Sequence, residues 1–344
     1  MKVLLIDYLS PRGHIKFDKI HIRALAEEAG EIDIVGKKGH FSDFEEKDNI
    51  SVTSFPDCLF KKMPLKPLTE RLLGFFRLLW INIHFNLKDY DVVIFLSYDV
   101  LSSFFFRKMG KVFLINHNNV SQLNNSIKLF LTRNLPSNYI HVALNKNMYD
   151  RLKEQLPQKN IVYVPHGLDT DTLSVIRPSF INEGEKFMFC PVNRNYDREV
   201  LEELLNSEEL NTYLETKNLS LYVKKNDITN GKLSRIRIID GFLKDEEYNY
   251  MLTHSMAIVL PYGKDFVYRC SGIFFECVAN RVPVLSTTLS DMMIYKDDTI
   301  IKFFDGVSSF INCLEDVMSL KEKNINMDIF NPRMYWKNVL KGIA

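Results

Sequence analysis

The chain has no cysteine pattern that would build a disulfide framework or a zinc site. Its five cysteines are scattered along 344 residues and include no Cys-x-x-Cys pair. Cys270 and Cys277 are seven positions apart, which is not a zinc-ligand spacing. Their odd number argues against a fully bridged, secreted protein. We therefore predict a reducing compartment and no metal site.

A long apolar run and a secretion signal are also missing. No uninterrupted apolar stretch reaches the about 18 residues that a membrane-spanning helix needs. Residues 1–7 lead directly into strand-like sequence, without the longer apolar stretch and small-residue cleavage site of a signal peptide. The formal net charge is +1, so no overall field attracts nucleic acid. These absences predict a cytoplasmic protein without a nucleic-acid partner.

Short apolar runs alternate with helical stretches through both halves of the chain, which at 344 residues is long enough for about two domains. Most runs are continuous, as expected for parallel strands covered on both faces. The predicted strands span 3–6, 32–35, 91–96, 112–116, 140–144 and 161–164, then 187–191, 219–223, 236–239, 256–260 and 282–286. This alternation predicts an α/β protein with two Rossmann-like parallel-sheet domains.

Turn-forming residues separate the two halves. Pro165, Gly167 and Asp169 begin a polar stretch that predicts a linker near 168–184. We place an N-terminal domain at 1–172 and a C-terminal domain at 173–328. Residues 329–344 contain a final helix with apolar side chains at helical spacing, ended by Gly342.

The most informative stretch, residues 260–285, has the order strand, loop, helix, turn and strand. Ser271 or Gly272 begins the helix, and serine is a preferred N-cap residue. Free amides in the first helical turn attract anions without a metal ion, and Arg269 adds a charged fork. Glu276, one turn further, is placed to accept hydrogen bonds from ribose hydroxyls. The alternative is an ordinary helix start with a solvated arginine and an exposed glutamate.

This stretch resembles the donor-binding segment of GT-B glycosyltransferases, notably glycosyltransferase family 4 and its relatives. The matching positions are Pro261, Ser271, Glu276, Ala279, Pro283 and Val284. Residues 241–257 resemble the family's segment before that loop, and residues 164–169 resemble its interdomain segment. The resemblance covers most of residues 140–290. It implies two domains facing each other across a cleft, with the final helix packed back toward the N-terminal domain.

The resemblance also implies donor-binding residues. Arg194 is the best match for the pyrophosphate arginine and Arg198 the second, although a basic residue after a strand is often only a solvated charge. Tyr268 falls where the family has a glutamate that contacts the donor sugar, so retention of anomeric configuration does not follow. Cys270 lies in the same loop and is included, although a cysteine here also fits a small apolar filler.

In the N-terminal domain, the resemblance places a glycine-containing phosphate and acceptor loop at Gly13 and His14. No Gly-x-Gly-x-x-Gly fingerprint is present. His117 follows a strand and resembles the family's histidine near the reacting sugar, where it could act as a base. Asp99 also follows a strand and is the candidate base of an inverting enzyme. Each has a structural alternative: a solvated loop histidine for His14, a capping or network role for His117, and an N-cap for Asp99.

Residues 60–88 combine apolar, aromatic and basic side chains. Six lysines and arginines lie between 61 and 88, against the single acid Glu70. This composition fits an amphipathic helix on an anionic membrane surface, and equally a helix packed on the sheet with a basic exposed edge.

We predict a metal-independent hexosyltransferase that moves a sugar from a nucleotide-diphosphate sugar, such as a UDP-sugar, to a saccharide or lipid-linked acceptor. No cofactor beyond the donor is expected. The setting would be bacterial surface polysaccharide synthesis, in the cytoplasm or at the inner face of the membrane. The alternatives are a GT-B-like nucleotide-sugar epimerase and a non-enzymatic two-domain sugar-binding protein.

Overall fold

Two parallel β-sheets organise the chain in the computed structural model, each with its own helices. The structure describes residues 1–10, 14–45, 47–60, 66–104, 106, 110–192, 194–228, 233–320 and 325–342. Unit 1 comprises residues 1–167, 268–270 and 328–344, and unit 2 comprises 168–267 and 271–327.

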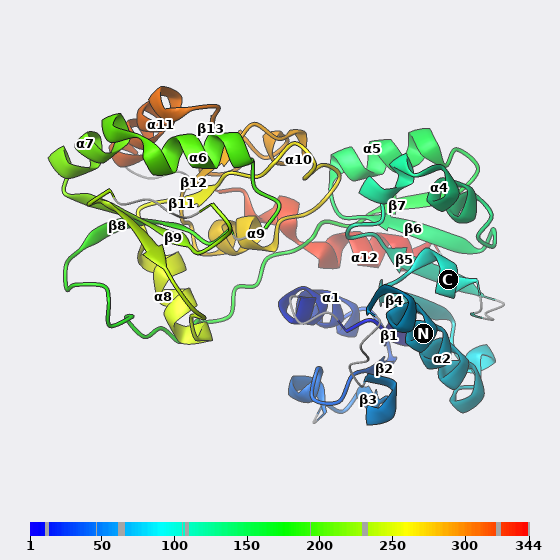
Figure 1. The fold of residues 1–344 in the computed structure, drawn as a ribbon. Coiled ribbons are helices and arrows are strands. Elements are labelled where there is room, and N and C mark those ends of the chain that lie inside the picture. The colour runs from blue at the N-terminus through cyan, green and yellow to red at the C-terminus, as the bar shows by residue number, and fades with distance from the viewer. Residues whose placement is uncertain are drawn as a thin grey trace. The chain divides into compact units, whose positions relative to one another are not determined.

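Unit 1 contains a seven-stranded parallel sheet with the order β3-β2-β1-β4-β5-β6-β7 (Figure 1). The central strands are continuous apolar runs, and residues 3–6 of β1 are fully buried. Its strands are β1 (Lys2–Asp7), β2 (Glu31–Gly36), β3 (Ile50–Ser54), β4 (Val92–Ser97), β5 (Lys111–Ile115), β6 (Tyr139–Ala143) and β7 (Asn160–Tyr163).

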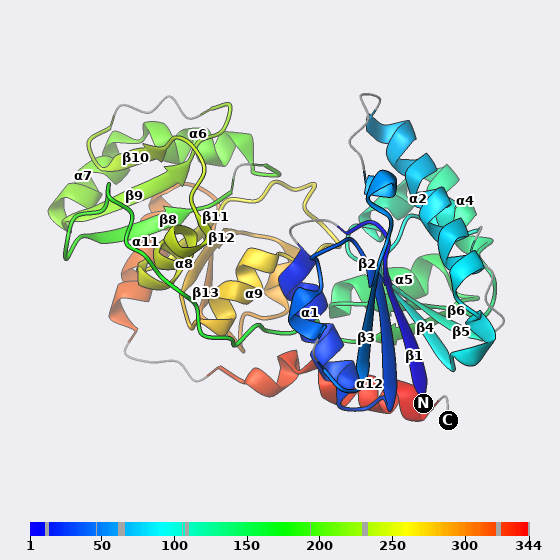
Figure 2. The same cartoon turned by 90° about the horizontal axis from the view of Figure 1, so that it is seen from below.

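Helices cover both faces of this sheet because alternate side chains of each strand point to opposite sides. Val3 and Leu5 pack in a core that includes Trp336 of α12, whereas Leu4 and Ile6 pack in a core that includes Leu78 of α2. Figure 2 shows α1 and α12 on one side of the sheet and α2 on the other. The helices are α1 (Ile15–Ala26), α2 (Lys66–His84), α3 (Val100–Ser103), α4 (Ser126–Arg133), α5 (Lys146–Gln155) and α12 (Pro332–Lys341). Short 3₁₀ turns are η2 (Ser42–Phe44), η3 (Asp57–Phe60), η4 (Leu87–Asp89), η5 (Ser121–Asn124) and η6 (Met327–Phe330).

Unit 2 contains a six-stranded parallel sheet with the order β10-β9-β8-β11-β12-β13. Helices α6, α7 and α11 lie on one side of it, and α8 and α9 on the other (Figures 1 and 2). The strands are β8 (Lys186–Cys190), β9 (Leu219–Lys224), β10 (Ile236–Ile239), β11 (Ile258–Leu260), β12 (Val284–Thr287) and β13 (Ile301–Phe304). The helices are α6 (Arg198–Asn206), α7 (Glu208–Thr216), α8 (Asp245–His254), α9 (Gly272–Ala279), α10 (Ser290–Met293) and α11 (Val307–Ser319).

The predicted fold class, two Rossmann-like parallel-sheet domains, is confirmed. The sequence prediction omitted two strands, β3 and β13. Both are edge strands with partly exposed side chains, so they lack the continuous apolar run that identified the other strands. The final helix begins at Pro332 and belongs to unit 1, where Trp336 is fully buried. Within the described ranges, no helix is long and apolar enough to cross a membrane.

Candidate functional site

The two sheets have the same order of strands around their centre, and in each sheet the carboxyl ends of the strands lie along one edge. In each sheet the chain runs outward over three strands and then returns to start the other half beside the first strand, at β1/β4 and at β8/β11. In open α/β sheets, ligands bind beyond the carboxyl ends of the strands at such a switch point. Ligands are therefore expected at the loops after β1, β4 and β5 in unit 1 and after β8 and β11 in unit 2.

His117 follows β5 at the carboxyl edge of unit 1. Its Nε2 lies 2.9 Å from the carbonyl oxygen of Leu96, an acceptor, so Nε2 carries the hydrogen and Nδ1 of the neutral ring is an acceptor. Burial lowers the pKa of His117 well below its ordinary value, and the nearby His14 lowers it further. The ring is thus neutral at neutral pH and can accept a proton at Nδ1.

His14 packs against His117, with ring centroids 4.2 Å apart and the ring planes tilted by 39°. It precedes α1 without capping it, and its buried Nδ1 has no hydrogen-bond partner among the described residues. Burial lowers the pKa of His14. The structure brings the two predicted histidines together, while Gly13, the other residue predicted for this loop, lies outside the described residues.

Asp99 caps helix α3. Its Oδ2 accepts the backbone N–H of Ser102 at 3.1 Å, and its own N–H donates to the Tyr8 hydroxyl at 2.7 Å. The N-cap role considered from the sequence is therefore present, and a role of Asp99 as base stays a prediction.

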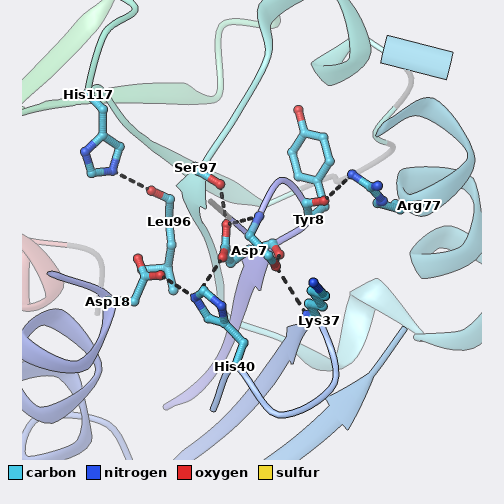
Figure 3. A network of polar contacts seen from close by, with 10 residues as sticks. Asp7, Tyr8, Asp18, Lys37, His40, Arg77, Leu96, Ser97 and His117 are labelled. Carbon is cyan, nitrogen blue, oxygen red and sulfur yellow. Dashed lines mark hydrogen bonds and ion pairs between the residues drawn. The ribbon is translucent and has the colours of Figure 1, made fainter. Parts of the chain in front are cut away.

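The loop after β1 is held in a constrained turn. Ser10 has a φ of 42°, in the left-handed region that serine rarely adopts, and its N–H donates to Asp7 Oδ1 at 3.0 Å. Ser97 Oγ donates to the same carboxylate oxygen (Figure 3). The buried Arg77 donates to the Tyr8 carbonyl at 2.9 Å. Backbone strain of this kind persists where the surroundings over-determine the conformation, which is common at binding sites.

Histidines that the sequence analysis did not select lie around the same edge. Trp336 Nε1 donates to His21 Nδ1 at 3.0 Å, so His21 Nε2 carries the hydrogen that His166 accepts at its carbonyl, 3.1 Å away. Burial lowers the pKa of His21 to about 3 and that of His166 to about 4. Phe17 contacts His117, His21 and His166. Phe17 and His21 are one turn apart on α1, but His117, His166 and Trp336 come from other segments, so only the tertiary structure shows the whole cluster.

His40 also lies near this edge, between two buried carboxylates. Its Nε2 is 3.1 Å from Asp18 Oδ2 and 3.4 Å from Asp7 Oδ2 (Figure 3). Burial lowers the pKa of His40, whereas burial raises the pKa of Asp18 well above its ordinary value, with a further contribution from Asp7.

In unit 2, the loops after β8 and β11 are joined by backbone contacts. The N–H of Asp197 donates to the Pro261 carbonyl at 2.7 Å, and the N–H of Gly263 donates to the Asn195 carbonyl at 2.9 Å. A Cβ on Gly263 would lie 3.0 Å from the Tyr196 carbonyl oxygen, so the close approach of the two loops favours glycine there.

Ser271 is the N-cap of α9, as predicted. Its Oγ accepts the backbone N–H of Phe274 at 3.1 Å and lies 2.9 Å from the Tyr262 hydroxyl. Gly272 is exposed, and a Cβ added there would meet no atom of the protein within 4 Å. The start of α9 therefore has room for a ligand to approach its backbone amides, which attract anions.

The arginines predicted after β8 differ in their surroundings. Arg194 is exposed, at the turn that follows the strand. Arg198 begins α6, and its side chain forms ion pairs with Glu202 at 3.0 Å and Asp227 at 3.3 Å. Since two carboxylates already neutralise Arg198, Arg194 is the better placed of the two to receive an anion.

Glu276 is half-buried on α9 and accepts a hydrogen bond from the Tyr248 hydroxyl at 3.0 Å. Burial raises the pKa of Tyr248 well above its ordinary value, so the phenol remains a donor. The bond fixes one carboxylate oxygen of Glu276.

Residues 268–270 group with unit 1, although the residues on either side belong to unit 2. Tyr268 has a φ of 53° and lies under Arg151, whose guanidinium carbon is 5.4 Å from the ring centroid. Arg269 Nε donates to Ser121 Oγ at 3.3 Å. Cys270 Sγ lies 3.7 Å from Asn145 Nδ2 and packs against the unit 1 core. Arg269 and Ser271, predicted as one site, are therefore held by different units.

A pocket of about 280 Å³ lies at the carboxyl ends of β11, β12 and β13. Tyr262 lines it, and the Tyr262 hydroxyl lies 2.9 Å from the Oγ of the Ser271 cap. The pocket's charged lining residues are three acids and one base, and Thr287 and Leu289 contribute polar and apolar surface. The charged residues are Asp197, Glu199, Asp305 and Lys264. A pocket of this size with polar and apolar walls can hold part of a small polar ligand that also has a flat or apolar group.

No protein-family model matches the chain, and no curated protein matches its sequence. Solved structures resemble it over nearly their whole length. UDP-GlcNAc 2-epimerase from Methanocaldococcus jannaschii aligns with a TM-score of 0.62 and 14% identity, covering 100% of this chain and 99% of that one. A UDP-forming α,α-trehalose-phosphate synthase from Burkholderia xenovorans gives 0.64 and 9%, covering 99% and 98%. Anabaena HepE in complex with UDP-glucose gives 0.56 and 13%, covering 100% and 94%.

These similarities show that the chain has the GT-B fold of two Rossmann-like domains. They include epimerases and a synthase alike, and they do not single out glycosyltransferase family 4.

Proposed function

We propose that the chain is a glycosyltransferase that takes a sugar from a UDP-sugar or related nucleotide-diphosphate sugar and passes it to a saccharide acceptor. The observation that carries the proposal is the open start of α9 at Ser271 and Gly272, next to a pocket that shares Tyr262 with it. The helix amides would receive the departing diphosphate without a metal ion. The solved structures of similar fold include enzymes named for UDP-sugars, which supports this donor class.

In unit 1, the neutral His117 and His14 stand where acceptor chemistry is expected. With Nε2 fixed by the Leu96 carbonyl, His117 presents Nδ1 as an acceptor. A hydroxyl that loses its proton to this atom becomes a stronger nucleophile toward the sugar. The two histidines thus provide a base or hydrogen-bonding pair suited to acceptor activation.

An epimerase is the second candidate, because two of the similar structures are UDP-GlcNAc 2-epimerases. Such an enzyme would need carboxylates that reach the sugar. At this edge of unit 1, Asp7 and Asp18 are fully buried against His40, and Asp99 caps α3. Because Asp7 and Asp18 are fully buried, neither is exposed to a sugar bound at this edge of unit 1, which favours transfer over epimerisation.

A thermal-shift screen tests the nucleotide class. We expect one nucleoside diphosphate, with UDP the first choice, to stabilise the protein by about 2.7 kcal/mol at about 100 times its Kd, and free hexoses to have no comparable effect. Screening UDP-, GDP-, CMP- and dTDP-sugars then identifies the donor. Stabilisation by free sugars alone would instead support a non-enzymatic sugar-binding protein.

Acceptor dependence separates the two enzyme candidates. A transferase releases the nucleoside diphosphate quickly only when a saccharide acceptor is present, and the sugar appears in the acceptor. An epimerase converts the donor without any acceptor and yields the epimeric sugar. Rapid acceptor-free formation of an epimer would overturn the transferase proposal while leaving the donor class intact.

A lipid-bound acceptor is supported by an apolar face on unit 1. Helix α3 contacts both α2 and α4, and all three helices expose large apolar side chains. This face consists of Leu72, Phe76, Leu79, Ile83, Leu101, Phe104, Ile127 and Phe130. The three helices carry five lysines and arginines and one acid, Glu70, although the buried Arg77 braces the β1 loop instead of facing outward. An apolar face with basic residues suits an anionic membrane surface at the inner face of the cell membrane.

Vesicle binding tests this surface. We expect the protein to sediment with phosphatidylglycerol vesicles more than with phosphatidylcholine vesicles, and the double change Phe76→Glu and Phe130→Glu to abolish the difference. Phe242→Glu is the matched control, because Phe242 is 83% exposed but belongs to unit 2. Equal sedimentation of the double variant and the control would exclude the apolar face as the membrane contact.

A further inference from the structure

Three side chains with metal-binding atoms converge inside unit 1. Asp7 ends β1, Asp18 lies in the first turn of α1, and His40 follows β2. Both aspartates are fully buried and His40 is 7% exposed. One ligand atom from each lies within 4.8 Å of the other two. Because they come from three separate segments, no spacing in the sequence indicates this cluster.

The distances fit a shared ion. His40 Nε2 is 3.1 Å from Asp18 Oδ2 and 3.4 Å from Asp7 Oδ2. An ion that binds nitrogen and oxygen at about 2.0–2.2 Å separates neighbouring ligand atoms by about 2.9 Å in octahedral and about 3.4 Å in tetrahedral geometry. Both distances from His40 Nε2 fall at this separation, and the third pair of ligand atoms lies within 4.8 Å, so a small rearrangement is enough to bind an ion.

The two carboxylates have unmet bonding capacity. Asp7 Oδ2 and Asp18 Oδ1 are buried and accept no hydrogen bond from the described residues. No described lysine or arginine forms an ion pair with either aspartate, and Lys19, which follows Asp18 in the sequence, pairs with Asp43. Buried carboxylates without a partner are costly, and charges in protein interiors are normally paired or bound to metal.

The other oxygen of Asp7 is held in the way that metal ligands usually are. Asp7 Oδ1 accepts hydrogen bonds from the Ser10 N–H and the Ser97 hydroxyl, which direct Oδ2 toward His40 (Figure 3). Ligand carboxylates in metal sites are oriented by such outer hydrogen bonds.

We propose that Asp7, Asp18 and His40 bind a divalent transition-metal ion. Two carboxylate oxygens and one imidazole nitrogen suit Zn²⁺, Mn²⁺ or Fe²⁺, whereas sites for Mg²⁺ and Ca²⁺ are built from oxygen. The ion neutralises the carboxylate pair and ties β1, α1 and the segment after β2 together at the base of the loop that leads to His14. The site belongs to unit 1 and does not depend on the proposed glycosyl transfer.

Zinc retention by the full chain tests the proposal. Protein stripped with a chelator, incubated with Zn²⁺ and desalted should retain one equivalent by elemental analysis. His40→Asn and Asp18→Asn should each weaken retention by at least about 100-fold, more than loss of an outer-shell partner usually does. His84→Asn is the matched control, because His84 is exposed on α2 and removes a histidine without touching the cluster.

Cobalt reports the ligand type, which matters because the five cysteines are free thiols. Co²⁺ at this site should give visible d–d bands without the near-ultraviolet charge-transfer band of a thiolate ligand. Zn²⁺ should also raise the Tm of the stripped wild-type protein by about 2–4 °C. These two measurements need no variant, so they decide the question even if His40→Asn fails to fold.

Equal zinc retention by wild type and His40→Asn would overturn the proposal, as would a thiolate band or an unchanged Tm. Each of these results would leave the nucleotide screen unaffected, so the metal site and the proposed function fail separately.

Discussion

Replacing His117 with alanine is expected to lower turnover by at least about 100-fold while the donor Kd changes by less than about threefold. The reason is the fixed orientation of the ring. Nε2–H donates to the Leu96 carbonyl, which leaves Nδ1 to take the proton from the hydroxyl of the saccharide acceptor. Removal of a proton acceptor that acts only in the reaction lowers kcat without removing donor contacts. Single-turnover rates and donor titration by calorimetry measure the two quantities.

The pH profile supplies a second readout for His117. Burial lowers the pKa of His117 well below its ordinary value, so the ring stays neutral as the pH falls through about 6.5. If His117 is the base, kcat should therefore hold its value below pH 6.5 and fall only at a more acidic pH. An enzyme whose base is an exposed histidine of ordinary pKa would instead lose half of its kcat near pH 6.5.

His254→Ala is the control for the His117 variant, since His254 is exposed on α8. Normal turnover in the His117→Ala protein would remove the residue from the catalytic machinery. A parallel loss of kcat and of folded protein, seen by circular dichroism, would show that the His14–His117 contact is structural.

Much of the fold could be predicted because parallel strands covered on both faces are written as continuous apolar runs. Residues 3–6 are such a run and form the fully buried part of β1. The same rule failed for β3, where Ser51 and Thr53 alternate with apolar residues at an exposed edge. Edge strands receive part of their stability from pairing with a neighbour, which local sequence does not encode.

The candidate site likewise contains some features that the sequence could predict and others that it could not. Ser271 as N-cap was predictable because capping is decided within three residues, between its Oγ and the Phe274 N–H. The neighbours of His117 were not, because His21 and His166 reach it through packing between distant elements. The bond of Arg269 to Ser121, 148 positions away, is likewise a tertiary feature that no motif indicated.

The Arg269→Ala variant is expected to lose about 10- to 100-fold in affinity for the nucleoside diphosphate, with the fold intact. Hydrogen bonds to charged groups are worth about 1.5–3 kcal/mol, and about 1.4 kcal/mol corresponds to tenfold in Kd. Arg269 stands two residues before the Ser271 cap in the same loop, and it is only half-buried, so truncation leaves no buried charge behind. Calorimetric titration with the nucleotide found in the screen measures the loss.

Arg269→Lys separates charge from geometry. Lysine keeps the positive charge but lacks the planar fork that binds two phosphate oxygens at once, so it should recover only part of the affinity. Arg177→Ala is the control for general loss of positive charge, because Arg177 is an exposed residue of unit 2 with only a 4.0 Å contact to Glu183. Unchanged affinity of the Arg269→Ala protein for every nucleoside diphosphate would exclude this arginine from the donor site. Arg194 would then be the first candidate for the diphosphate and Arg198 the second.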